Sequence, residues 1–119
     1  AGVVLRVHLA EGRLALLEGR PGDALMAARR AARGRSPSLR ISALEAEALR
    51  QLGQPQEAAD ALAPSRTRNS DDPAVLAVLL RVNADLGADR ENRAVAARAK
   101  LYPGHPVLGP LLHDLGLAN

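Results

Sequence analysis

Apolar residues recur every three or four positions along most of the chain, the spacing that places side chains on one face of an α-helix. The pattern predicts helices over residues 3–18, 21–33, 37–52, 55–63, 73–86, 89–101 and 107–115. It predicts no strand. We therefore expect an all-α fold of about seven helices.

The first predicted helix has apolar residues on more than one side. One face is formed by residues at helical spacing, namely Val7, Ala10, Leu14 and Leu17. Leu9 and Leu16 extend the apolar surface around the helix. We expect this helix to be contacted on more than one flank.

Other helices show a single apolar face. In the third helix this face is Ile41, Leu44, Ala48 and Leu52, and in the fifth it is Val75, Val78, Leu79, Val82 and Leu86. We expect Ile41 and Leu44 to lie in the core. The second and fourth helices are rich in alanine, so their neighbours can approach closely.

One short sequence recurs between the helices. Gly19-Arg20-Pro21-Gly22-Asp23-Ala24 returns 34 residues later as Gly53-Gln54-Pro55-Gln56-Glu57-Ala58, and again as Gly87-Ala88-Asp89-Arg90-Glu91-Asn92. The glycine suits the left-handed residue that closes a helix, and the proline suits the first residue of the next helix. A carboxylate in the first turn interacts favourably with the helix dipole. The recurring corner predicts paired helices in a repeat array.

Polar and proline residues predict the remaining helix boundaries. Ser36 and Pro37 are a candidate cap and first residue of the third helix, and Asp72 and Pro73 of the fifth. Pro64 should end the fourth helix, before a polar loop over residues 65–70. Pro110 fits the last helix only within its first turn.

The composition predicts a thin core. The chain has 24 alanines, no Cys, Trp or Phe, and one aromatic residue, Tyr102. Absent cysteines exclude disulfides and thiolate metal sites and leave the redox compartment open. No apolar run is long enough to span a membrane, and no signal peptide is visible. We expect an excerpt of a longer protein and a soluble domain, cytoplasmic or periplasmic; the sequence does not distinguish the two.

With its paired helices in 34-residue units, the chain resembles the tetratricopeptide repeat family. Gly12 and Ala46 match the small residue of the first helix, and Ala24 and Ala58 match the alanine early in the second. Gly19, Gly53 and Gly87 match the corner glycine. The resemblance implies a single domain over residues 1–119, with units at 5–38, 39–72 and 73–106 and a terminal helix at 107–116.

Some positions depart from the family pattern. Glu11 and Glu45 replace the leucine before the small residue, which indicates rotated first helices or a looser interface. Asn92 replaces the expected alanine of the third unit, and the family's large aromatic residues are missing. The chain also lacks the Lys and Asn set with which some relatives hold a chaperone's C-terminal carboxylate.

The resemblance implies a right-handed superhelical stack of antiparallel helix pairs, an α-solenoid, whose first helices line a concave groove. The corresponding residues are Arg6, Leu9, Arg13, Arg40, Glu47, Arg50, Arg81 and Asp85. The arginines favour an acidic peptide or partner helix, because guanidinium groups bind carboxylates bidentately. Alternatively, these arginines are solvated or pair with Glu47 and Asp85 across neighbouring units.

The leading interpretation is therefore a protein–protein interaction scaffold. The alternative is a structural or self-assembly module that stacks through its end faces, with Val3, Val4 and Leu5 at one end and Leu112, Leu115 and Leu117 at the other. The second helices and their loops carry a candidate basic convex stripe, made of Arg29, Arg30, Arg33, Arg35, Arg66, Arg68, Arg98 and Lys100. A net charge of only +3 and the lack of stacking aromatics argue against nucleic acid.

Catalytic and metal-binding patterns are absent from the sequence. His8 and Glu11 lie one turn apart, but no second histidine lies nearby, and His113 and Asp114 fall on different faces of a helix. We expect no enzyme activity, cofactor, metal or small-molecule substrate in this chain, which leaves room for a catalytic domain elsewhere in the parent protein.

Overall fold

The computed structural model describes residues 2–34, 38–63 and 70–118. These residues form seven helices and no strand: α1 (Gly2–Leu17), α2 (Pro21–Ala32), α3 (Leu39–Gln51), α4 (Pro55–Ala61), α6 (Pro73–Asp85), α7 (Asp89–Ala99) and α8 (Leu108–Asp114). The all-α prediction is confirmed. Every predicted helix is present, with bounds shifted by a few residues at most.

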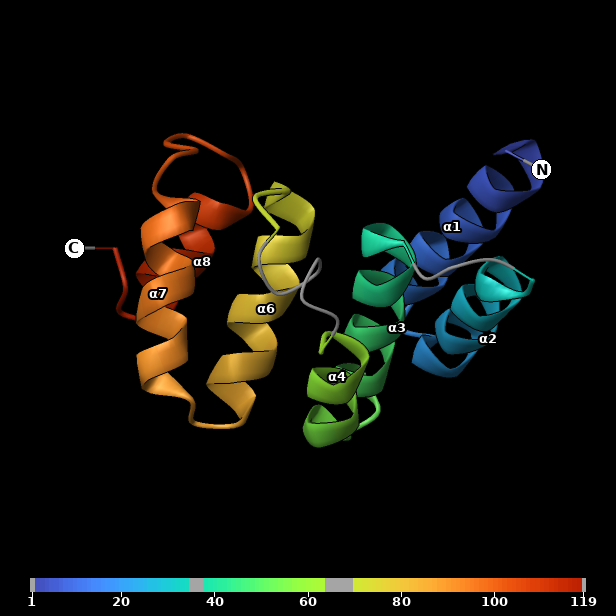
Figure 1. The fold of residues 1–119 in the computed structure, drawn as a ribbon, viewed down its shortest axis with the longest axis horizontal. Coiled ribbons are helices and arrows are strands. Elements are labelled where there is room, and N and C mark those ends of the chain that lie inside the picture. Colours follow the sequence, from blue (N-terminus) through green and yellow to red (C-terminus); the bar gives the residue numbers. More distant parts are fainter. Residues whose placement is uncertain (1, 35–37, 64–69, 119) are drawn as a thin grey trace.

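The helices form pairs that follow one another along the long axis of the molecule (Figure 1). Helix α3 packs against both α1 and α2, and α6 packs against both α3 and α4. The first helix of each later pair therefore lies on both helices of the pair before it. Helix α8 packs on α6 at the C-terminal end. This recurring arrangement is the one expected of a helical repeat array.

The predicted corners are confirmed at the backbone. Gly19, Gly53 and Gly87 have φ values of 73°, 80° and 69°, the left-handed conformation that glycine adopts without steric cost. Pro21 and Pro55 are the first residues of α2 and α4. The repeated sequence therefore ends one helix and begins the next.

The start of α3 differs from the prediction. Ser38 is its N-cap: the hydroxyl oxygen accepts a hydrogen bond from the backbone N–H of Ile41 at 3.2 Å. The prediction that Ser36 caps a helix starting at Pro37 is wrong, because α3 begins two residues later. Ser36 and Pro37 themselves, like Pro64 and the loop over 65–69, lie outside the described residues.

The other boundary predictions on described residues are confirmed. The Asp72 carboxylate accepts a hydrogen bond from the N–H of Ala74 at 2.9 Å, and Pro73 is the first residue of α6. Pro110 lies in the first turn of α8. There its missing N–H costs no helical hydrogen bond.

The core is centred on α6. Its largest fully buried side chains are Leu76, Leu80, Leu108, Val75 and Val82, all from α6 and α8. Ile41 and Leu44 of α3 are buried as predicted, at 4% and 6% exposure. The third pair also has a buried hydrogen bond between its helices: the Asn92 amide donates to the backbone carbonyl of Leu80 at 3.0 Å. Asn92 thus serves as a link between α7 and α6 where the family pattern has alanine.

Helix α1 is attached through small residues. Ala15 of α1, Ala24 of α2 and Ala48 of α3 form a separate buried cluster. Gly12 lies so close to α3 that an added Cβ would overlap the side chain of Leu44. Small residues therefore let α1 and α3 approach closely. This agrees with the match of Gly12 to the small residue of the family's first helix.

The predicted apolar face of α1 is not buried. Val7, Leu14 and Leu17 are 47%, 54% and 86% exposed, and Ala10 is also exposed. Helices α2 and α3 both contact α1, but they cover the side that carries Gly12 and Ala15 and leave the predicted face exposed.

The two ends of the stack differ. Val4 at the N-terminal end is 52% exposed, and the side chain of Val3 lies outside the described part. At the C-terminal end, Leu112 is buried, and Leu115 and Leu117 pack against the main core. The expectation of an exposed apolar C-terminal face is wrong, because α8 folds back onto α6. No helix in the described ranges is long and apolar enough to cross a membrane.

Candidate protein-binding groove

Two adjoining hollows lie along the first helices of the pairs. Both are lined by Arg13 and Leu16 of α1 and by Glu47 of α3. The wider hollow, about 520 Å³, adds Leu17, Arg50, Gln51 and Arg81. The narrower one, about 120 Å³, adds Arg40, Ala43, Leu44, Ala74, Val75 and Val78. Because the hollows share three residues, they form one groove across α1, α3 and α6.

A row of alternating charges crosses the wider hollow. Arg13, Glu47 and Arg81 are spaced 34 residues apart, so they occupy the same position on three neighbouring first helices. The repeat thus places a carboxylate between two guanidinium groups. The resemblance to the tetratricopeptide repeats had implied that all three residues line the groove.

Glu47 is the acidic centre of the groove, and it is 7% exposed. One carboxylate oxygen, Oε2, accepts hydrogen bonds from Arg50 Nη2 at 2.8 Å and Gln51 Nε2 at 2.9 Å. The other, Oε1, accepts from Arg50 Nε at 3.2 Å and lies 4.0 Å from Arg81 Nη1. A buried carboxylate needs such donors to offset its lost hydration.

Arg50 joins two units through its guanidinium group. Besides the two bonds to Glu47, its Nη1 donates to Asp85 Oδ2 on α6 at 3.3 Å. The hydrogen bond to Glu47 is the largest cause that raises the pKa of Arg50 above its ordinary value, while partial burial opposes it. Arg50 is therefore cationic and already engaged by carboxylates of its own chain, as the alternative interpretation of the arginines expected.

The remaining groove arginines differ in how well they are paired. Arg40 Nε lies 3.4 Å from Asp72 Oδ2. Arg81 reaches Glu47 only at 4.0 Å and shares it with Arg50 and Gln51. Arg13 is exposed and has no carboxylate within ion-pair distance among the described residues. The groove therefore keeps cationic character at Arg13 and Arg81.

The structure brings most of the predicted site residues together. Arg13, Arg40, Glu47, Arg50 and Arg81 line the groove, and Asp85 joins it through Arg50. Arg6 and Leu9 line neither hollow. They lie nearer the N-terminus of α1 than Arg13, where α1 extends beyond the hollows.

Sequence reasoning missed several apolar groove residues. Leu17, Leu44, Val75 and Val78 were assigned to core faces, yet all four line the hollows. Leu44, Val75 and Val78 are at most 7% exposed, so they form the floor while serving the core. Leu44 and Val75 directly follow Ala43 and Ala74, which also line the hollow. This adjacency was the signal available in the sequence, because neighbouring helix positions can border the same groove.

Two arginines of the candidate basic stripe are paired with carboxylates. Arg29 Nε lies 3.7 Å from Glu45 Oε2, and Arg30 Nη2 lies 3.7 Å from Glu11 Oε2. The two glutamates that depart from the family pattern thus pair with the second helix of the first unit. Arg35, Arg66 and Arg68 lie outside the described residues.

No protein-family model matches the chain, and comparisons with curated proteins and with solved structures give no match. Kinship with the tetratricopeptide repeats is therefore still a prediction from sequence.

Proposed function

We propose that this chain is a protein–protein interaction scaffold whose groove across α1, α3 and α6 binds a peptide or helix of a partner protein. The observation that carries the proposal is the groove itself, two adjoining hollows lined by three consecutive first helices. A surface that spans several repeats suits an elongated ligand. The proposal includes the right-handed superhelix of the tetratricopeptide family.

The charges of the groove favour a ligand with a carboxylate. Arg50 and Arg40 have partners within the chain, whereas Arg13 is unpaired among the described residues and Arg81 makes one long contact. A carboxylate between Arg13 and Arg81 would receive charge-assisted hydrogen bonds from both sides. Glu47 lies between them and would repel a poorly placed acidic group, which makes recognition depend on register along the groove.

The floor of the groove favours a ligand that also has an aliphatic side chain. Leu16, Ala43 and Val78 border the narrower hollow, and its volume of about 120 Å³ matches one medium side chain. Apolar contacts would contribute affinity, and the arginines would contribute orientation. We therefore expect an acidic segment that contains an aliphatic residue.

Selection from a displayed random peptide library tests the proposal. The groove variant combines Arg13→Glu with Arg81→Gln; glutamine at position 81 avoids a second carboxylate beside Glu47. The control combines Arg90→Glu with Arg93→Gln, two exposed positions of α7 that change the net charge equally. We expect the wild type and the control to enrich the same acidic, aliphatic peptides and the groove variant to lose them. Equal enrichment by all three proteins would refute the groove.

A further inference from the structure

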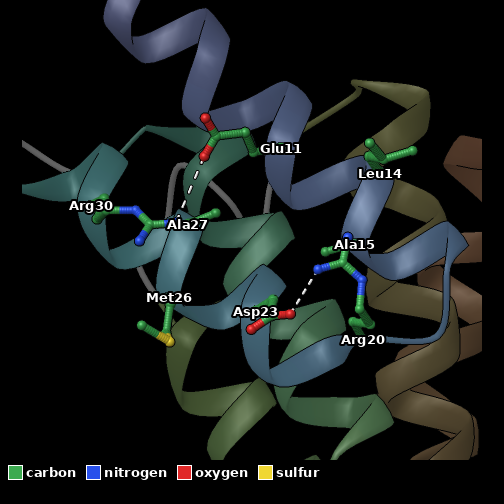
Figure 2. Close-up of a pocket in the computed structure, with 8 residues that line it drawn as sticks. All are labelled: Glu11, Leu14, Ala15, Arg20, Asp23, Met26, Ala27 and Arg30. Atoms are coloured by element: carbon green, nitrogen blue, oxygen red, sulfur yellow. Dashed lines mark hydrogen bonds and ion pairs between the residues drawn. The ribbon is translucent and has the colours of Figure 1, made fainter.

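The outer face of the α1–α2 pair carries exposed apolar side chains. Val4, Val7 and Leu14 of α1 and Met26 of α2 are between 47% and 57% exposed. Leu14 and Met26 border a hollow of about 250 Å³, with Ala15 and Ala27 at its floor (Figure 2). We call this surface the outer face; it lies on the other flank of α1 from Arg13 and Leu16 of the groove.

The 34-residue spacing relates these positions to interface positions of the later units. Ile41 and Val75 occupy the place of Val7 in the next two units, and Ala48 and Val82 occupy the place of Leu14. All four are at most 4% exposed, because α3 and α6 each lie against the preceding pair. The outer face has the same kind of residues, and no helix in the described ranges covers it.

At the opposite end of the stack, the segment between α7 and α8 exposes two large apolar side chains, Leu101 at 72% and Val107 at 41%, whereas α8 buries most of its own. Leu108 and Leu112 of α8 are buried, and the neighbouring His113 and Asp114 side chains are 85% and 78% exposed. A second copy therefore offers fewer exposed apolar side chains at its C-terminal end than at its outer face. Head-to-tail stacking is disfavoured, and an arrangement of outer face against outer face is favoured.

The charges at the outer face suit a partner with the same surface. Two ion pairs border the hollow: Arg30 Nη2 with Glu11 Oε2 at 3.7 Å, and Arg20 Nη1 with Asp23 Oδ2 at 2.7 Å (Figure 2). Arg20 also pairs with Glu18, so the face presents both positive and negative groups around an apolar centre. A surface that carries both charges can be complementary to itself across a two-fold axis, where a residue of one copy meets an oppositely charged residue of the other.

We propose that the outer face binds a second copy of this chain, giving a two-fold symmetric dimer with the α1–α2 pairs packed against each other. Leu14 and Met26 of one copy would enter the hollow of the other. The two grooves lie on the other flanks of α1 and stay open. The dimer would present two ligand sites to one partner or to two.

The size of the face predicts a weak dimer. Helix α1 has 16 residues, so it is about 24 Å long, and two neighbouring helices span a width of about 20 Å. The two copies together would bury about 1,000 Å², at the small end of specific interfaces. The dimer should therefore dissociate on dilution.

Sedimentation equilibrium of the 119-residue chain tests the proposal, over concentrations from about 1 µM to about 1 mM. We expect the mass to rise from monomer to dimer and to stop there. Leu14→Glu and Met26→Glu should each raise the dissociation constant about tenfold or more, because a carboxylate would be buried at the apolar centre. The matched control is Leu101→Glu, which introduces the same charge at a site that is 72% exposed.

Far-UV circular dichroism establishes that each variant is folded, and all three sites are exposed enough to tolerate glutamate. A chain that is monomeric at the highest concentration would overturn the proposal. So would a mass that grows beyond the dimer, or equal weakening by Leu14→Glu and Leu101→Glu. The groove variant should dimerise like the wild type, so failure of either proposal leaves the other intact.

Discussion

Helices α1 and α6 have similar apolar sequences but different surroundings. In α6, every residue from Val75 to Leu80 is buried, whereas in α1 Val7, Leu14 and Leu17 are about half exposed or more. The difference comes from position in the stack, because α6 has α3 and α4 on one side and α7 and α8 on the other. Apolar periodicity identifies residues suited to burial, and the stack decides which of them are covered. Where the two disagree, as in α1, apolar side chains are left exposed.

A leucine-to-alanine substitution in each of the two helices should show the difference in burial most clearly. Leu80→Ala in α6 should reduce the free energy of unfolding by about 2–5 kcal/mol, because Leu80 is fully buried and its removal leaves a cavity. Leu14→Ala in α1 should change it by less than about 0.5 kcal/mol at a concentration where the chain is monomeric. Urea denaturation measures both values. Similar losses for the two variants would contradict the difference in burial.

Substitution of Glu47 tests how much the ion pairs within the groove contribute to the stability of the fold. Glu47→Gln should reduce the free energy of unfolding by about 1–3 kcal/mol, because Arg50 loses charged hydrogen bonds at a buried position. It should also strengthen binding of acidic library peptides, since the charge that opposes them is removed. Urea denaturation and peptide titration measure the two effects. Unchanged stability would mean that Glu47 is not the structural centre of the groove.

Removing the N-cap of α3 or of α6 should reduce the free energy of unfolding by a smaller amount. Ser38→Ala and Asp72→Ala should each cost about 1 kcal/mol, because each removes the acceptor of an N-terminal N–H group. Conservative Ser38→Thr and Asp72→Asn variants retain an acceptor and should lose less. Thermal unfolding measures the series; equal Tm values for alanine and its conservative partner would argue against capping at that site.

Much of the fold could be predicted from local signals. The left-handed glycines at 19, 53 and 87, the prolines at 21 and 55 and the cap at Asp72 are each determined by neighbouring backbone groups. Ser38 was missed as the cap of α3 because Ser36-Pro37 offers the same local signal two residues earlier. Two nearby capping sequences cannot be ranked without the packing of α3.

The position of the groove could be predicted from the sequence, but which of its arginines pair with carboxylates could not. A 34-residue repeat places Arg13, Glu47 and Arg81 in a row whatever their rotamers. Which arginines are neutralised depends on side-chain geometry across helices, such as the reach of Arg50 to both Glu47 and Asp85. The exposure of α1 was also beyond the sequence, since it depends on what lies next to the pair.

Affinity capture from a lysate of the source cells tests the central claim most directly. The wild type, the groove variant with Arg13→Glu and Arg81→Gln, and the control with Arg90→Glu and Arg93→Gln would be compared side by side. The groove predicts a partner that the wild type and the control retain and the groove variant loses, with an acidic segment as its contact. Capture of the same proteins by all three would contradict recognition through the groove.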